Sequence, residues 1–181
     1  MIKDIPILMS APMVRAILGG TKTMTRRTSD RWEKAMPGDH LLVREEWGVH
    51  RDFDNIYDRC KCVGRGFIHY RADEISCPVK KWRRSLFMPK WASRITLELF
   101  AKRREHLQDI TEVDAIKEGV GSGFQMNGGW PDYQHINKSG ICEATQDTAR
   151  MSYVTLFESI NGPGSWNLNP LLWVLEFKRI K

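Results

Sequence analysis

The sequence predicts an α+β fold, in which a mostly antiparallel sheet or small β-barrel is flanked by helices. Three observations support this class. Segments with strand-like patterns occur in the first, middle and last parts of the chain. Capped helical segments lie among them, and strand and helix do not alternate in the regular way that a parallel α/β sheet requires. The 181 residues are enough for a single domain with a core of its own.

In chain order, the first helix is expected over 11–18, because Ser10 is a typical N-cap residue and the two glycines at 19–20 stop the helix. The Pro-Gly-Asp turn at 37–39 leads into the first expected strand. Strand-like alternation or β-branched content is found in four segments, namely 40–47, 67–72, 95–100 and 171–180.

Two more helices are expected in the second half of the chain. One begins with the capping pattern Thr111–Asp114 and ends near Gly119, and the other covers 145–160. Residues 119–140 hold six of the fourteen glycines and are predicted to form a long loop. The charged stretch 51–65 has no periodicity and is also predicted to be a loop.

Composition excludes several classes of protein. The hydrophobic content of 41% and the charged content of 28% are those of a globular domain, not of a disordered or fibrous chain. No apolar run has the length of a membrane span, and the N-terminus has no secretory core, so we expect a cytoplasmic protein without a membrane partner. The net charge of +6 favours an anionic partner.

The positive charge is concentrated in residues 80–105, which hold nine basic and two acidic side chains, with tryptophan and phenylalanine among them. Basic groups neutralise phosphates and aromatic rings stack on bases, so this stripe predicts a surface for single-stranded or flipped-out nucleic acid. The alternative is a solvated basic face whose aromatic rings are buried in the core. The residues expected to contact nucleic acid in this stripe are Lys81, Trp82, Arg83, Arg84, Lys90, Trp91 and Arg94.

Four cysteines raise the question of a metal site. Cys60 and Cys62 are one residue closer than the usual zinc pair, and Cys77 and Cys142 form no second pair. Reduced thiols in a loop account better for this spacing, so the prediction includes no metal and no cofactor.

The most informative segment is Gly20–Arg27, which fits the pattern G-x-K-x-x-[ET]-x-R. It resembles the signature of the ASCH domain, a branch of the PUA-like β-barrel superfamily. The segments Lys34–Val43 and Trp173–Lys178 resemble the turn and the closing strand of such domains. Met13–Leu18 and Met88–Ile95 are similar to the enlarged ASCH proteins of phages and prophages. The resemblance implies one PUA-like domain over residues 1–181, with inserts at about 48–90 and 119–145.

One branch of this family removes acetyl groups from N4-acetylcytidine, with a lysine, a threonine and a glutamate as catalytic residues. The resemblance assigns these roles to Lys22, Thr25 and Glu118. A threonine needs a base to take its proton, and Lys22 can do so only if its pKa falls from ~10.4 toward 7. The neighbouring charges of Arg26 and Arg27 would contribute to that fall, and both arginines are also expected to contact the nucleic acid.

Other interpretations remain open at this point. The chain could be a non-catalytic RNA- or DNA-binding module that reads a modified or flipped base. It could be a metal-independent ribonuclease, or Lys22, Thr25 and Glu118 could be surface residues without a role. In all three functional readings the expected partner is a nucleoside or a nucleic acid, with RNA preferred over DNA.

Overall fold

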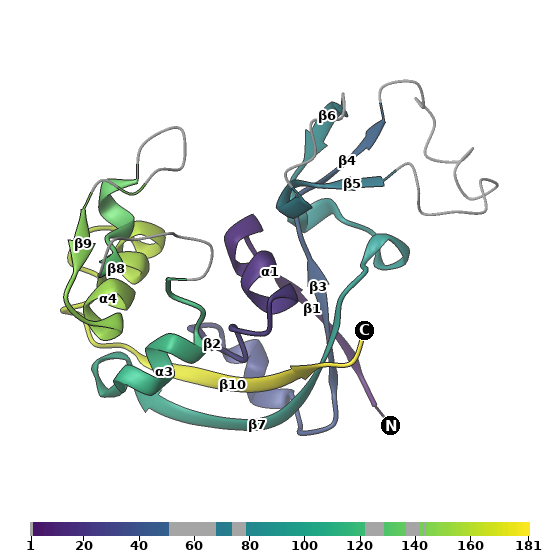
Figure 1. Ribbon diagram of the computed structural model, residues 1–181. Helices are drawn as coiled ribbons and strands as arrows, with labels where there is room; N and C mark the ends of the chain where they lie inside the picture. Colours follow the sequence, from purple (N-terminus) through teal and green to yellow (C-terminus); the bar gives the residue numbers. More distant parts are fainter. Residues whose placement is uncertain (1, 51–67, 74–78, 122–128, 137–141, 143) are drawn as a thin grey trace.

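The computed structural model describes residues 2–50, 68–73, 79–121, 129–136, 142 and 144–181 (Figure 1). Its larger sheet has five strands in the order β1-β3-β7-β10-β2. In that order they are β1 (Asp4–Leu8), β3 (His40–Arg44), β7 (Thr96–His106), β10 (Leu171–Arg179) and β2 (Met24–Arg27). The β1–β3 pair is parallel and the other three pairs are antiparallel. The mixed α+β class is therefore confirmed, whereas the described strands form an open sheet with β1 and β2 at its edges, not a closed barrel.

Two smaller sheets and three helices complete the described part of the chain. The three-stranded sheet has the order β5-β4-β6 and the two-stranded sheet pairs β8 with β9. Their strands are β4 (Trp47–His50), β5 (Ile68–Tyr70), β6 (Val79–Arg83), β8 (Trp130–Pro131) and β9 (Thr145–Gln146). The α-helices are α1 (Ala11–Leu18), α3 (Glu112–Lys117) and α4 (Ala149–Asn161). None of them is long and apolar enough to cross a bilayer.

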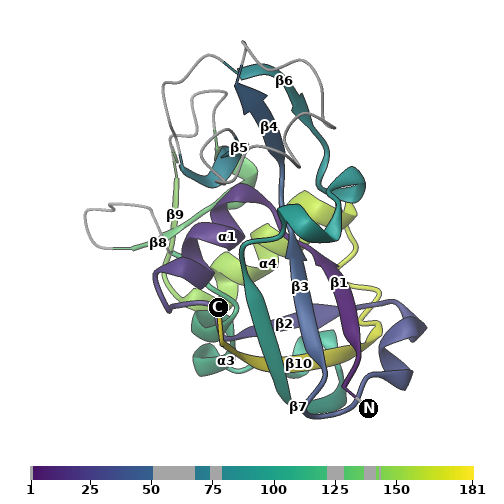
Figure 2. The same cartoon turned by 90° about the vertical axis from the view of Figure 1, so that its right-hand side faces the viewer.

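The larger sheet curves around α1, as the two views in Figures 1 and 2 show. Val14 and Ile17 of α1 are buried in the main core cluster together with Leu41, Leu97 and Phe177 from three strands of the sheet. A second cluster joins α3, α4, the start of β10 and Leu107, which directly follows β7. The segment that links α1 to β2 therefore lies between two packed regions of the core.

The predicted strands differ from the observed ones where charged residues interrupt or extend them. The strand expected over 40–47 is broken after Arg44, because the buried carboxylate of Glu45 binds Arg94 and the chain then enters the smaller sheet as β4. The strand expected over 95–100 continues to His106, since its charged second half pairs with β10. Strands β1, β2 and β6 were not expected from the sequence.

The helix predictions are closer to the structure. The helix over 11–18 and the closing strand over 171–180 are confirmed to within one residue. Thr111 caps α3 as expected, because its hydroxyl oxygen accepts from the amide of Asp114 at 3.1 Å. The last helix begins only at Ala149, because 145–146 pairs with β8. The loop predicted over 51–65, half of the one over 119–140, and Cys60, Cys62 and Cys77 lie outside the described residues. The described half of 119–140 is not loop throughout, because it contains β8.

Candidate functional site

The chain enters the site through a tight connection between α1 and β2. The amide of Lys22 donates to the carbonyl of Ala16 at 3.0 Å, and the amide of Thr23 donates to the carbonyl of Lys117 at 2.9 Å. These two bonds fix the connection between the end of α1 and the end of α3. Lys22 is thereby held against the residue that follows α3, although the two segments are distant in sequence.

That residue is Glu118, and Gly119 allows it to approach. Gly119 has a φ of +87°, which favours glycine. A Cβ at this position would lie 3.0 Å from the Cβ atoms of both Ala16 and Lys22. The missing side chain therefore lets the end of α3 lie directly on Lys22.

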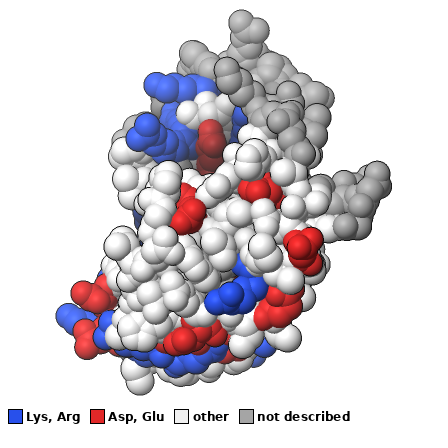
Figure 3. All heavy atoms as spheres, turned by 90° about the vertical axis from the view of Figure 1, so that its left-hand side faces the viewer, with Lys and Arg blue, Asp and Glu red and all other residues white. Residues whose placement is uncertain are grey.

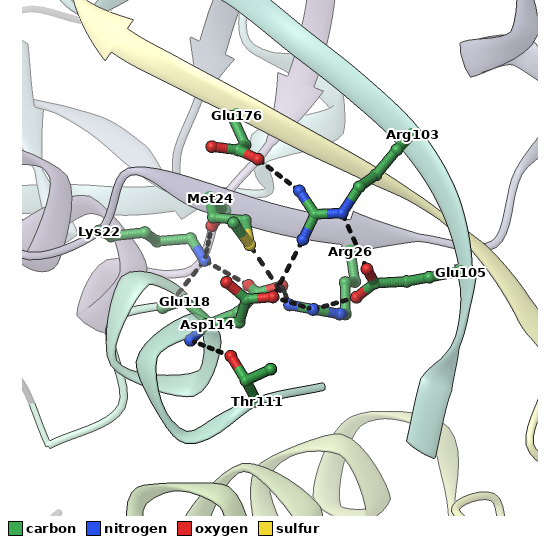
Figure 4. Close-up of polar contacts among 9 residues, drawn as sticks. All are labelled: Lys22, Met24, Arg26, Arg103, Glu105, Thr111, Asp114, Glu118 and Glu176. Atoms are coloured by element: carbon green, nitrogen blue, oxygen red, sulfur yellow. Dashed lines mark hydrogen bonds and ion pairs between the residues drawn. The ribbon is translucent and has the colours of Figure 1, made fainter. Parts of the chain in front are cut away.

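Lys22 and Glu118 form a buried ion pair (Figure 4). Lys22 Nζ lies 2.9 Å from Glu118 Oε2, and the exposed fractions of the two residues are 2% and 6%. The ammonium also donates to the carbonyl oxygens of Met24 at 2.9 Å and of Glu118 at 2.7 Å, so it has three acceptors. Burial lowers the pKa of Lys22; the carboxylate of Glu118 opposes this shift, and the charges of Arg27 and Arg26 add to it.

Arg26 extends this pair into a network of charges. Its guanidinium binds Glu118 Oε1 at 3.3 Å and Asp114 at 3.1 Å, and it also binds Glu105. Arg103 binds the same Glu105 and Asp114 from the far side, at 2.8 and 2.9 Å. Since the side chain of Arg26 has no exposed area, it has no surface to offer a nucleic acid, contrary to the expectation from sequence.

Thr25 lies on β2 beside the network and lines a small pocket of about 130 Å³. Glu118, Arg27 and Tyr153 line the same pocket, whereas Lys22 does not and lies behind Glu118. Thr25 itself is only 3% exposed. Burial raises the pKa of Tyr153 well above its usual value, so its phenol is protonated at neutral pH.

A larger pocket of about 910 Å³ adjoins the small one, and Glu118 and Arg27 line both. Its other walls come from the first turn of α1, from residues 84–86 and from Leu156 and Ile160 on α4. This volume lies within the range of sites that bind small organic ligands. The two pockets together bring Thr25, Glu118 and Arg27 to one hollow of the protein.

The basic stripe predicted over 80–105 is divided by the fold. Arg94 is bound to Glu45 at 2.9 Å and to Asp73 at 2.7 Å. Lys90 is bound to Asp4. Both therefore balance acidic side chains from other segments, and the second half of the stripe lies on β7, where Arg103 belongs to the network around Arg26.

The remaining basic residues gather around β6. Figure 3 shows Lys and Arg side chains at the upper end of one face, at the height of β4–β6 in Figure 1. Within the described part of the chain, Lys81, Arg83 and Arg84 have no carboxylate in ion-pair contact. Arg83 lies over the ring of Trp47 at 5.1 Å. Arg84 reaches the rim of the large pocket. We call residues 81–91 the rim segment.

The aromatic residues of the rim segment are not all buried. Phe87 is 70% exposed and Trp91 is 46% exposed, although one edge of Trp91 packs on the buried Trp47. Trp82 is half-buried under the guanidinium of Arg71. The alternative in which the aromatic rings of the basic stripe are buried in the core is therefore wrong for Phe87 and Trp91.

Several residues of the site were not found from sequence. Arg103, Glu105, Asp114 and Glu176 were not expected to surround Arg26, although the alternation of charges at 103 and 105 on a strand places both on one face. Of the cysteines, Cys142 is described, and its thiol lies 2.9 Å from the carbonyl oxygen of Ala144. No group of three metal-binding side chains occurs within the described ranges.

Comparison of the chain with protein-family models, with curated proteins and with solved structures finds no match.

Proposed function

We propose that the chain is a cytoplasmic ASCH-type amidohydrolase with a PUA-like fold. Its substrate is an N4-acylated cytidine or a related modified pyrimidine, as a nucleoside or within a nucleic acid. The observation that supports this most is the buried contact between Lys22 and Glu118, which are 96 residues apart in sequence, next to a pocket lined by Thr25. These are the three residues to which the ASCH-like motifs assign the chemistry.

Lys22 and Glu118 supply a base and an acid through one proton transfer. Movement of a proton from Lys22 Nζ to Glu118 Oε2, across 2.9 Å, converts the ion pair into an amine and a carboxylic acid. Burial favours this neutral pair because a low dielectric penalises both charges. Arg26, at 3.3 Å from the other carboxylate oxygen, favours the carboxylate and opposes the transfer.

The acyl group then moves to Thr25. The hydroxyl oxygen of Thr25 attacks the amide carbon of the acyl group, and its proton passes to Lys22 through the carboxyl group of Glu118, which lies between the pocket and Lys22. Glu118 donates its proton to the N4 nitrogen, which leaves as the amino group of cytidine. These steps leave an ester on Thr25, a lysine ammonium and a glutamate carboxylate.

Water completes the cycle. The carboxylate of Glu118 takes a proton from a water molecule, whose oxygen attacks the ester carbon. The ammonium of Lys22 returns a proton to the oxygen of Thr25 through the same carboxyl group. The products are a carboxylic acid and the free enzyme with its neutral pair. Glu118 acts from within the pocket, and Lys22 acts from behind it.

The test is release of acetate from N4-acetylcytidine by the purified chain. We expect turnover by the wild-type chain and its loss in Thr25→Val, because valine has the shape of threonine without the nucleophile. Thr25→Ser is the matched control, since serine keeps the hydroxyl, and it should retain activity. Activity in Thr25→Val equal to that of the wild type would remove Thr25 from the mechanism.

A second candidate is supported by two observations: all three donors of Lys22 have protein acceptors, and the rim segment carries exposed rings and unpaired basic groups beside the large pocket. In this reading the chain binds a modified or flipped base without reacting with it. It predicts RNA binding that weakens steeply as salt increases, without acetate release.

Charge reversal at two residues of the rim segment tests this candidate. Arg83→Glu with Arg84→Glu should weaken RNA binding and reduce its salt dependence. The control is Arg104→Glu on β7, outside the rim segment. Equal RNA affinity in the wild-type chain and the double variant would contradict the candidate.

A further inference from the structure

We propose that Arg27 forms an anion-binding subsite in the large pocket, which takes the phosphate attached to the sugar of a nucleoside ligand. The inference deepens the proposed function and rests on it for the identity of the base. The negative charge of the ligand does not depend on the proposed function, because it follows from the surroundings of Arg27.

The guanidinium of Arg27 is half-buried, and its hydrogen-bond partners within the described ranges are neutral. Its Nη2 donates to the carbonyl of Leu8 at 2.9 Å and lies 3.4 Å from the sulfur of Met9. Its Nε is buried and has no acceptor among the described residues. No described carboxylate forms an ion pair with it, in contrast to Arg26, which binds three.

Glu118, the acidic residue that shares both pockets with Arg27, does not neutralise it. Its two carboxylate oxygens are engaged by Lys22 at 2.9 Å and by Arg26 at 3.3 Å. Burial lowers the pKa of Arg27; the charge of Glu118 opposes this shift only in part, and the nearby charge of Arg31 adds to it. A negatively charged ligand group would therefore neutralise the positive charge of Arg27, which burial makes unfavourable.

The start of α1 adds to the attraction of an anion. Leu8 and Met9, which Arg27 contacts, lead directly into α1, and residues 8–13 line the large pocket with Arg27. The side chain of Ser10 makes no capping bond, and the first turn contains no acidic residue. First-turn amides have no acceptor within a helix, so the positive end of α1 faces the same space.

Within the proposed function the anionic group of the ligand is a phosphate, because a nucleotide carries phosphate and no carboxylate. A guanidinium binds phosphate oxygens through charge-assisted hydrogen bonds. Nε of Arg27 is buried and Nη2 is bound to the carbonyl of Leu8, so Nη1 is the group that is left for the ligand. Thr25 and Arg27 lie two residues apart on β2 and therefore on the same side of the strand. A base whose N4 group reaches Thr25 in the small pocket would leave its sugar and phosphate toward the large one.

Calorimetric titration of the full chain tests the subsite without requiring turnover. The probes are cytidine, cytidine 5′-monophosphate and a cytidine trinucleotide. We expect the monophosphate or the trinucleotide to bind roughly 10- to 100-fold more tightly than cytidine, as for a charge-assisted hydrogen bond. Tighter binding of the trinucleotide assigns the phosphate to a strand, and tighter binding of the monophosphate assigns it to a free nucleotide.

Two variants separate the subsite from general effects of charge. Arg27→Met should abolish the preference for the phosphorylated probes and leave the affinity for cytidine unchanged. Arg104→Met, an exposed arginine on β7 that lies over Trp173, removes the same charge and should retain the preference.

Equal binding of cytidine and its phosphates by the wild-type chain would overturn the inference, and this comparison needs no variant. Equal weakening of all three probes by Arg27→Met would also overturn it and would assign Arg27 to the base instead. Failure of the proposed function is a different result, because it would abolish acetate release while the preference for phosphate remains.

Discussion

Replacement of Lys22 by methionine should destabilise the fold by about 3–5 kcal/mol, the range for removal of one partner from a buried ion pair. Three acceptors lose their donor: the carbonyls of Met24 and Glu118 and the carboxylate of Glu118. Arg26 remains 3.3 Å from that carboxylate and limits the loss. For a chain of this length each kcal/mol lowers the melting temperature by roughly 2–4 °C, so we expect a decrease of roughly 6–20 °C.

Urea unfolding followed by circular dichroism measures this change. The control is Lys34→Met, an exposed lysine whose replacement should alter the free energy of unfolding by no more than about 0.5 kcal/mol. If Lys22→Met cost as little as the control, the ammonium of Lys22 would not be buried against Glu118, and the reasoning about its pKa would be refuted.

Three further predictions concern other parts of the structure. Asp39→Asn should cost about 1–3 kcal/mol, because the carboxylate accepts from the amides of Met36 and Lys3. The same bonds lower the pKa of Asp39, so the wild-type advantage should be present above about pH 3.8 and disappear at lower pH; an advantage that is independent of pH would contradict this. Gly119→Ala should destabilise more than Gly20→Ala in urea unfolding, since both glycines have positive φ but a Cβ at Gly20 meets no atom within 4 Å; equal losses would contradict the close approach to Lys22. Burial raises the pKa of Tyr133 to about 12. The contribution of its protonated phenol to the free energy of unfolding, up to about 3 kcal/mol, should therefore be lost as pH rises from 10 to 12. Tyr133→Phe should flatten that part of the pH profile, and an unchanged profile would refute the assignment.

Local signals in the sequence predicted the elements whose cause is local. The cap at Thr111, the stop after α1 and the alternation in β10 each depend on residues within a few positions, and the structure has all three. Strand β2 was not expected, because its polar residues are in a sheet only through pairing with β10, which lies far away in sequence. The charged half of β7 was missed for the same reason.

The candidate site shows the same division. Lys22 and Thr25 lie three residues apart in one motif, so the sequence could point to both. The contact of Lys22 with Glu118 depends on how α1 and α3 pack. The basic stripe was predicted from the charges of residues 80–105 alone. Glu45 and Asp73, which neutralise Arg94, lie outside that segment and meet it only in the folded chain. Opposite charges that meet in space decide which basic residues stay available to a ligand.

In the proposed reaction, Thr25 carries the acyl group between the two halves. Rapid acid quenching of the chain with N4-acetylcytidine, followed by mass spectrometry of its peptides, tests this most directly. We expect the added mass of one acetyl group on the peptide that contains Thr25, and no such addition in Thr25→Val. Acetate release by the wild-type chain with the acetyl group on another residue, or undiminished release by Thr25→Val, would contradict it.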